Sequence, residues 1–204
     1  MTGFPVVILI SGRGTNLQAI VDEVRAGKLP ADIRAVISNN PDAAGLKQAR
    51  AAGLHTEVVD HRAYPTRAAF EQALAQAIDH HSPKLVVLAG FMRILGRDFI
   101  EHYHGRLINI HPSLLPSFPG LHGQEQAREW GVKISGCTVH FVTPDLDMGP
   151  IILQKAVPVL EDDTADDLAA RILEQEHIAY SQAIGLVLSG RTKIEGRRVR
   201  LLPG

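Results

Sequence analysis

Runs of apolar, often β-branched residues alternate in the first half of the chain with segments whose apolar residues recur every three or four positions. Each run predicts a buried strand, because a strand covered on both faces shows no polar alternation. The predicted strands lie at residues 6–10, 33–38, 56–59, 84–90 and 107–110. Apolar positions with helical spacing lie at residues 17–24, 43–52, 66–78 and 97–103. This alternation predicts an α/β fold with a doubly wound, mostly parallel sheet and right-handed crossovers.

The pattern changes in the second half of the chain. A predicted helix at 124–130 is followed by two strands, at 135–143 and 151–159, that are close enough in sequence to pair in antiparallel fashion at one edge of the sheet. A long helix is predicted from 164 to about 188, and a terminal hairpin from 192 to 201 with Gly196 in its turn. Since no linker or repeat interrupts the chain, we expect one domain over residues 1–204.

The composition narrows the classes of function. Hydrophobic residues make up 45% of the chain and charged residues 21%, as in ordinary soluble proteins. A formal net charge of −1 provides no broad field for nucleic acid. No apolar run is long enough to span a bilayer, and the amino-terminal run is too short for a signal peptide. A single cysteine, Cys137, fits a reducing compartment. We therefore expect a cytoplasmic protein with no nucleic-acid or membrane partner.

The segment "SGRGTN" joins the first predicted strand to the first predicted helix. Glycines bring backbone N–H groups close to a ligand, and a helix N-terminus favours an anion, so Gly14, Thr15 and Asn16 are candidates to bind a phosphate. The alternative is a plain turn in which Thr15 or Asn16 caps the helix. No Lys-Ser/Thr pair follows, and Leu17 replaces the third glycine of a dinucleotide fingerprint. A monophosphate therefore fits better than NAD.

A second candidate segment is "LINIHPSLLPSFPG", where Asn109 and His111 end the fifth predicted strand. Side chains two residues apart in a strand share a face, and ligands of open α/β sheets bind beyond the carboxyl ends of the strands. The alternative is an ordinary strand-end histidine beside an amide that braces the loop. The paired spacing and the rigid Pro112 favour a functional pair.

The loop "PDLDMGP" carries two acids, of which we expect Asp145 to be solvated and Asp147 to point inward. A carboxylate beside an imidazole keeps the ring protonated and oriented. An imidazolium together with an amide donor can stabilise an oxyanion on a tetrahedral carbon. Asn109, His111 and Asp147 thus suit acyl or formyl transfer.

Four segments together resemble the folate-dependent phosphoribosylglycinamide formyltransferase family of purine biosynthesis, over nearly the whole chain. They are "VVILISGRGTNLQAI", "VVLAGFMRIL", "INIHPSLLPSFPG" and "GCTVHFVTPDLDMGPIILQ". The resemblance implies a Rossmann-like formyltransferase domain over residues 1–204. It implies formyl transfer from the cosubstrate 10-formyltetrahydrofolate to the amine of 5-phosphoribosylglycinamide, giving formylglycinamide ribonucleotide and tetrahydrofolate.

The resemblance also implies roles for residues. Asn109 and His111 would stabilise the oxyanion, and Asp147 would support His111 and proton transfer. The loop of Gly14, Thr15 and Asn16 would bind the substrate phosphate, and Glu176 would hold the ribose. Glu176 lies on a helical stripe with Leu168, Ile172 and Ala179, although a neighbouring stripe through Leu173 and His177 would leave it as a surface acid.

On the folate side the resemblance implies contacts from Asn109, Asp147 and six further residues. One of the six is Arg67, whose positive charge suits the carboxylates of the folate tail. The others are Met92, Arg93, Ile94, Leu95 and Thr143. Met92 and Leu95 could equally be core residues, and Arg67 a helix-surface charge. His140 is a secondary site candidate. Ser113 beside His111 suggests a hydrolase, but the nucleophile elbow G-x-S-x-G is absent.

Other readings stay open at this point. The chain could be a formyltetrahydrofolate deformylase, a formyltransferase for another amine, or a nucleotide-binding module without activity. The pairs His80–His81 and His102–His104 suggest a metal, but no neighbouring carboxylate or cysteine in the sequence completes a set, so we expect surface histidines and no metal site. The expected partners are small-molecule substrates, with a homodimer left open.

Overall fold

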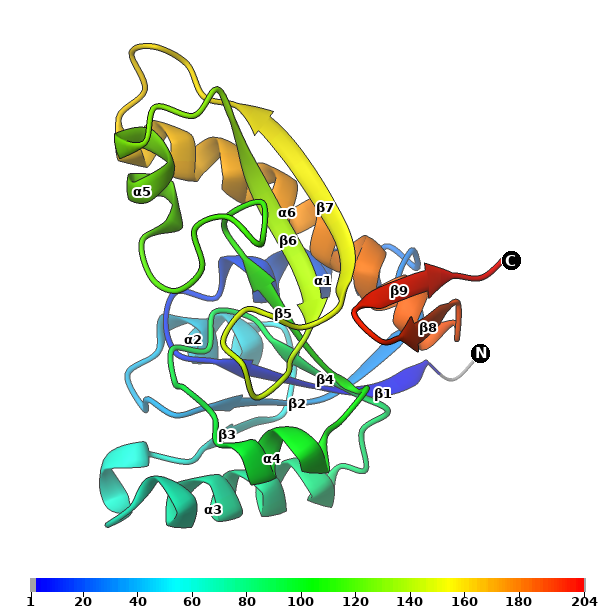
Figure 1. The fold of residues 1–204 in the computed structure, drawn as a ribbon. Coiled ribbons are helices and arrows are strands. Elements are labelled where there is room, and N and C mark those ends of the chain that lie inside the picture. Colours follow the sequence, from blue (N-terminus) through cyan, green and yellow to red (C-terminus); the bar gives the residue numbers. More distant parts are fainter. Residues whose placement is uncertain (1–2, 204) are drawn as a thin grey trace. The chain divides into compact units, whose positions relative to one another are not determined.

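The computed structural model describes residues 3–203, and its elements are labelled in Figure 1. The chain groups into two compact units, Met1–Ile108 and Asn109–Gly204, and the division falls inside strand β5 (Leu107–His111). Each unit is described by itself below. The single domain over residues 1–204 stays a prediction.

The first unit holds a parallel sheet with the strand order β3-β2-β1-β4. The strands are β1 (Phe4–Ile10), β2 (Ala31–Ser38), β3 (Thr56–Val58) and β4 (Leu85–Leu88). Strand β1 pairs in parallel with β2 and β4, and β2 pairs in parallel with β3. The run from Val6 to Ile10 is fully buried, as expected for a central strand covered on both faces. The predicted parallel α/β architecture is confirmed.

The helices of the first unit follow the predicted segments. They are α1 (Thr15–Arg25), α2 (Ala44–Ala51), α3 (Arg67–His80) and α4 (Arg97–His102). A short 3-10 helix, η1 (His61–Ala63), was not predicted, because it lacks an apolar period. Thr66 caps α3 as predicted, since its hydroxyl accepts the backbone N–H of Ala69 at 3.2 Å.

The second unit is built around an antiparallel pair, β6 (Ile134–Phe141) and β7 (Ile151–Pro158). Its strand order is β5-β6-β7-β9-β8, where β8 (Thr192–Glu195) and β9 (Arg198–Leu201) form the predicted terminal hairpin. Strand β9 joins β7 through the parallel pair Ile151 and Arg198. The antiparallel strands and the terminal hairpin of the sequence prediction are both confirmed.

The two helices of the second unit are α5 (Gly123–Glu129) and α6 (Ala165–Leu188). Helix α6 begins with a capping box, in which Thr164 and Asp167 satisfy each other's backbone N–H groups. Leu168, Ile172 and Ala179 on α6 are fully buried, and the helix packs on β6 and β7. No helix among the described residues is long and apolar enough to cross a membrane.

Gly136 tests the close packing of β6 against β7. A Cβ atom at this position would lie 1.9 Å from the carbonyl oxygen of Lys155 on β7. We expect Gly136→Ala to lower the free energy of unfolding by about 1–3 kcal/mol, as overpacking does in other cores. Urea unfolding followed by circular dichroism measures the change. Gly12→Ala is the control, because nothing lies within 4 Å of a Cβ there. Equal stability of the two variants would contradict this account of the packing.

Candidate active site

The glycine loop turns from β1 into α1 at Gly14. This residue has a φ of 79° and is the N-cap of α1, and no side chain makes a capping hydrogen bond. Thr15 and Asn16 are therefore the first helical residues, and the alternative in which one of them caps the helix is wrong. The first backbone N–H groups of the helix have no intrahelical partner, which is the arrangement that suits an anion.

Close contact with α2 fixes the shape of this loop. The backbone N–H of Gly45 donates to the carbonyl oxygen of Gly12 at 3.0 Å, and a Cβ on Gly14 would lie 2.7 Å from the Cα of Gly45. Glycine is thus required at position 14 both for its left-handed backbone and for this approach. The loop is held in place by protein contacts alone.

Ser11 joins the carboxyl ends of three strands in the first unit. Its hydroxyl donates to Oδ1 of Asn39 after β2 and accepts the backbone N–H of Met92 after β4, at 2.5 and 2.7 Å. Its own N–H donates to the carbonyl oxygen of Gly90. The glycine loop and the segment beginning at Met92 therefore meet at one edge of the sheet, as predicted for these two strand ends.

Four consecutive residues predicted to line the folate differ in how exposed their side chains are. Met92 and Ile94 are each 69% exposed, and Arg93 is also exposed, whereas Leu95 is buried. Met92 is thus not a core residue, while Leu95 is one. The exposed apolar side chains of Met92 and Ile94 offer a surface to a flat ring.

Arg67 lies beside the end of this segment. Its Nε is 3.5 Å from Oε1 of Glu71, and the same Glu71 oxygen accepts the backbone N–H of Gly96 at 2.7 Å. Glu71 is buried, so it anchors the segment and Arg67 together. Sequence reasoning missed Glu71, because an acid on a helix gives no signal of what it contacts across the fold.

In the second unit, β5 carries both Asn109 and His111. His111 is only 4% exposed, and its Nε2 donates to the carbonyl oxygen of Phe118 at 2.8 Å. Phe118 has a positive φ of 54°, an uncommon conformation for a residue with a side chain. Since a carbonyl only accepts, this bond fixes a hydrogen on Nε2 of His111.

Ser113 and Thr138 brace the loop that follows His111. The hydroxyl of Ser113 donates to the carbonyl oxygens of Ser117 and Phe118 at 2.6 and 3.2 Å. Thr138 on β6 donates to the carbonyl oxygen of Ser113 at 2.7 Å. Ser113 is fully buried, and its hydroxyl is used in holding the loop. These contacts argue for a structural serine and against the hydrolase reading.

Asp147 contacts His111 from the loop between β6 and β7. Oδ2 of Asp147 lies 3.5 Å from Nδ1 of His111 and accepts the backbone N–H of Gly120 at 2.8 Å. Asp147 has a φ of 52°, an uncommon conformation for a residue with a side chain, whereas Asp145 is exposed. The structure thus brings Asp147 to His111, and Thr143 lies at the start of the same loop, where its hydroxyl donates to the carbonyl oxygen of Asp145.

Gly149 allows the loop to fold back in this way. A Cβ at this position would lie 1.7 Å from the carbonyl oxygen of Phe141. The base of the loop is closed by the N–H of Phe141, which donates to the carbonyl oxygen of Pro150 at 2.9 Å. Asp147 therefore projects from a loop whose two ends are fixed.

His140 is the third ionisable group of this cluster. It is 2% exposed, its Nδ1 donates to the carbonyl oxygen of Phe141 at 2.9 Å, and its Nε2 lies 3.8 Å from Oδ1 of Asp147 without a hydrogen bond. Burial lowers the pKa of His140, although its backbone hydrogen bond and Asp147 act in the opposite direction. The ring is thus a neutral neighbour of Asp147.

Glu176 faces the interior of the second unit. It is buried on α6, in the same stripe as Leu168 and Ile172, so the surface alternative is wrong. Burial raises the pKa of Cys137 on β6 to about 12, and the nearby charge of Glu176 adds to this effect. The Cys137 thiol therefore stays protonated and is no nucleophile.

A comparison with protein families places these residues in context. The formyl transferase family model matches residues 5–184 of the chain. The chain belongs to the formyl transferase family. Membership makes it an enzyme of the transferase class, and the mostly parallel α/β fold is the fold of its formyl transferase relatives.

Individual relatives agree with the family. The chain is 50% identical over 189 residues to the phosphoribosylglycinamide formyltransferase of Escherichia coli, covering 93% of this chain and 89% of that protein. It is 47% identical to the trifunctional purine biosynthetic protein adenosine-3 of Bos taurus, covering 93% of this chain but only 19% of that protein. A crystal structure of glycinamide ribonucleotide transformylase 1 from Symbiobacterium toebii is 53% identical, with a TM-score of 0.96 over 99% of this chain and 95% of that one.

The lowered pKa of His140 predicts a pH dependence of stability. In the unfolded chain a histidine has a pKa near 6.5, whereas burial lowers the pKa of the His140 ring, which binds its proton only at lower pH. Acidification below about pH 6.5 therefore favours unfolding, by up to ~1.4 kcal/mol per pH unit from this group. We expect His140→Gln to make the decline between pH 6.5 and 5.5 shallower, as measured by urea unfolding at each pH.

The control for this experiment is His104→Gln, because His104 is exposed. It should leave the pH dependence of the wild-type protein unchanged. An equally steep decline in wild type and His140→Gln would contradict the role of this buried ring.

Proposed function

We propose that the enzyme transfers the formyl group of 10-formyltetrahydrofolate to the amine of 5-phosphoribosylglycinamide. The products are formylglycinamide ribonucleotide and tetrahydrofolate. The observation that carries the proposal is the position of His111 between a carbonyl oxygen and the carboxylate of Asp147, on the strand that also carries Asn109. The similarity to relatives named for this reaction supports the same substrates.

His111 supplies the positive charge in this proposal. Both of its ring nitrogens face oxygen atoms, Nε2 the carbonyl of Phe118 and Nδ1 the carboxylate of Asp147, an arrangement that suits a ring with hydrogens on both nitrogens. The Nδ1 contact of 3.5 Å is long for a hydrogen bond. Nδ1–H is therefore the group that can donate a hydrogen bond to a substrate oxygen.

The reaction proceeds through a tetrahedral carbon. The amine nitrogen forms a bond to the formyl carbon, and the carbonyl electron pair moves onto oxygen. Asn109 and the charged His111 stabilise this oxyanion by donating hydrogen bonds. When the carbonyl re-forms, the bond to N10 of the folate breaks, N10 gains a proton, and the amine loses one. Asp147 supports this proton transfer and holds His111 in its charged form.

We assign the remaining contacts to binding. The backbone of the glycine loop at Gly14, Thr15 and Asn16 receives the phosphate at the N-terminus of α1, because helix N-termini favour anions. Glu176 accepts hydrogen bonds from the ribose hydroxyls. Both assignments remain proposals from the family resemblance, supported by the loop conformation and by the inward position of Glu176.

On the folate side we assign the ring of the cosubstrate to the segment beginning at Met92 and its tail to Arg67. We propose that the ring contacts the exposed side chains of Met92, Arg93 and Ile94, which the buried Leu95 supports. The family resemblance adds Asn109, Thr143 and Asp147 as polar contacts. Arg67, which is 59% exposed on its side chain, is free to meet the carboxylates of the tail while it stays near Glu71.

Three further expectations stay predictions. They are the cytoplasm as the location of the enzyme, small molecules as its only partners, and a homodimer as an assembly left open. A deformylase, a formyltransferase for another amine and a binding module without activity remain the rival functions.

Absorbance of the folate product separates these rivals. The enzyme is mixed with 10-formyltetrahydrofolate in the presence of 5-phosphoribosylglycinamide or of water alone. We expect turnover only with the nucleotide. Turnover in water would indicate a deformylase, and binding of both compounds without turnover would indicate a binding module.

Substitutions in the His111 cluster test the roles of its members. We expect His111→Ala to lower kcat by about 10²–10³-fold, the cost of removing one oxyanion donor. Asp147→Asn should lower kcat by about 10²–10⁴-fold, because the charge that orients and protonates the ring is lost. Steady-state kinetics with both substrates measure the effects.

Asp145→Asn is the matched control, since it removes an acid from the same loop at an exposed position. It should retain wild-type kcat. Full activity in His111→Ala that still binds both substrates would remove the catalytic assignment, and full activity in Asp147→Asn would remove the proton-transfer role.

A further inference from the structure

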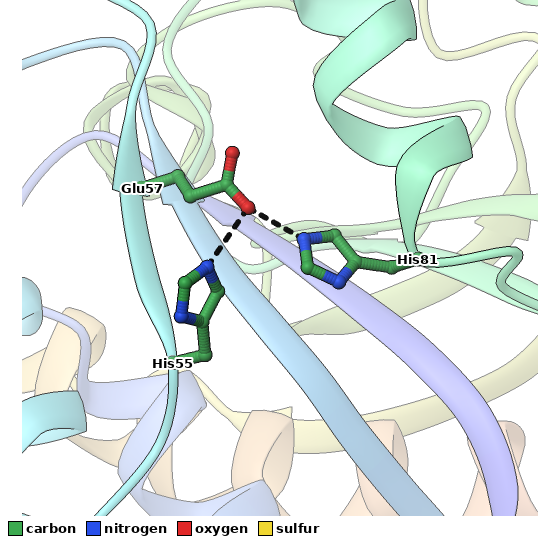
Figure 2. A group of neighbouring side chains, drawn as sticks. All are labelled: His55, Glu57 and His81. Atoms are coloured by element: carbon green, nitrogen blue, oxygen red, sulfur yellow. Dashed lines mark hydrogen bonds and ion pairs between the residues drawn. The ribbon is translucent and has the colours of Figure 1, made fainter.

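A group of metal-ligating side chains lies in the first unit at the edge strand β3. His55 stands just before β3, Glu57 lies on it, and His81 directly follows the last residue of α3. Figure 2 shows both imidazole rings turned toward the carboxylate of Glu57, one from the strand and one from the helix end. None of these residues belongs to the site proposed for formyl transfer.

The three side chains converge on one oxygen atom. Nε2 of His55 lies 3.0 Å from Oε1 of Glu57, and Nε2 of His81 lies 2.5 Å from the same oxygen. The two nitrogens and the carboxylate oxygen all lie within 4.8 Å of one another. Ligand atoms around a tetrahedral zinc ion, each about 2.0–2.2 Å from the metal, lie about 3.3–3.6 Å apart. The two rings, His81 above all, would therefore draw back from Oε1 of Glu57 to admit an ion, while all three ligand atoms stay within the span that one ion can bridge.

The charge of the group also suits a cation. Oε1 of the Glu57 carboxylate faces the Nε2 atoms of both rings, so an acidic oxygen and two imidazole nitrogens are directed at one point. A metal ion would replace the two hydrogens now shared with the carboxylate, leaving each neutral ring with its hydrogen on Nδ1.

The sequence prediction on these histidines is wrong in one respect. It expected no carboxylate beside His80 and His81, yet Glu57 bonds His81 across 24 positions of sequence. The sequence around Glu57 and around His81 does not indicate this contact, because it depends on the position of β3 relative to the end of α3. His102 likewise has a carboxylate neighbour, Asp79, at 2.7 Å, but no third ligand joins this pair in the part of the chain that the structure describes.

We propose that His55, Glu57 and His81 form a binding site for one divalent transition-metal ion of the zinc class. Two imidazole nitrogens and one carboxylate oxygen are typical ligands of Zn²⁺, Ni²⁺ and Co²⁺, whereas Mg²⁺ and Ca²⁺ prefer oxygen ligands. The fourth position is left to water, since the His55 side chain is 58% exposed and the site opens to solvent.

The ion would link an edge strand to a helix. Strand β3 has three residues and lies at the end of the strand order in its unit, paired only with β2 among the described strands. A ligand that binds the folded chain and not the unfolded one stabilises the fold. The role that follows is structural: the metal would hold β3 to the end of α3.

Metal binding to the full-length enzyme, stripped of metal with a chelator and then dialysed, tests the proposal. Titration calorimetry with ZnCl₂ should show one ion per chain, and the thermal midpoint should rise with zinc and reach a plateau. CoCl₂ should give the visible absorption of a nitrogen- and oxygen-ligated ion. MgCl₂ at the same concentrations should produce neither effect.

Single substitutions locate the site. His55→Ala and His81→Gln should each weaken zinc binding by at least about tenfold, because each removes one of three ligands. We expect His55→Ala to leave the fold intact because the side chain is 58% exposed, so the test stays valid if His81→Gln unfolds. His102→Gln is the matched control, since it breaks a histidine–carboxylate pair without a third ligand, and it should bind zinc as the wild type does.

The proposal is overturned if zinc does not bind, or if it binds equally well to His55→Ala and His81→Gln, or if His102→Gln abolishes binding. The result of the formyl-transfer assay does not depend on zinc binding at this site. Zinc-free enzyme is expected to keep its transferase activity at temperatures below its thermal midpoint, so failure of either proposal leaves the other intact.

Discussion

The contact of His111 with two oxygen atoms is the interaction on which the candidate site depends. One ring nitrogen is fixed by the carbonyl oxygen of Phe118, and the other faces Asp147. These two contacts fix the orientation of the ring, so its hydrogen-bonding groups stay at one place. The loops that present the two oxygens are themselves fixed by Ser113 and by Gly149. Rigid loops at the ends of buried strands thus provide the orientation that electrostatic catalysis needs.

The two units differ in the chemical groups that they place at the strand ends. In the first, the backbone of the glycine loop and the hydroxyl of Ser11 arrange the strand ends, and few charged groups are needed. In the second, a carboxylate and two buried histidines carry the ionisable chemistry. Burial lowers the pKa of His140, whereas His111 faces Oδ2 of the same carboxylate at 3.5 Å.

Much of the fold could be predicted from periodicity. The inward position of Glu176 could not, because two neighbouring helical stripes fit the pattern and only the structure shows which one is buried. The chain pattern also indicated Asn109, His111 and Asp147 as a group. It could not reveal Glu71 beneath Arg67 or Glu57 beside His81, since these contacts join elements whose relative position no local pattern encodes. The capping alternative for Thr15 failed for a related reason: the left-handed backbone of Gly14 ends the loop one residue earlier.

The missing side chain at Gly149 has a consequence for protein engineering. Because the backbone of Phe141 occupies the space where a Cβ would stand, no residue other than glycine fits at this base of the loop that carries Asp147. The exposed apex at Asp145 and Leu146 carries no such restriction. Randomising the apex alone would vary the surface offered to a cosubstrate while the acid keeps its attachment points.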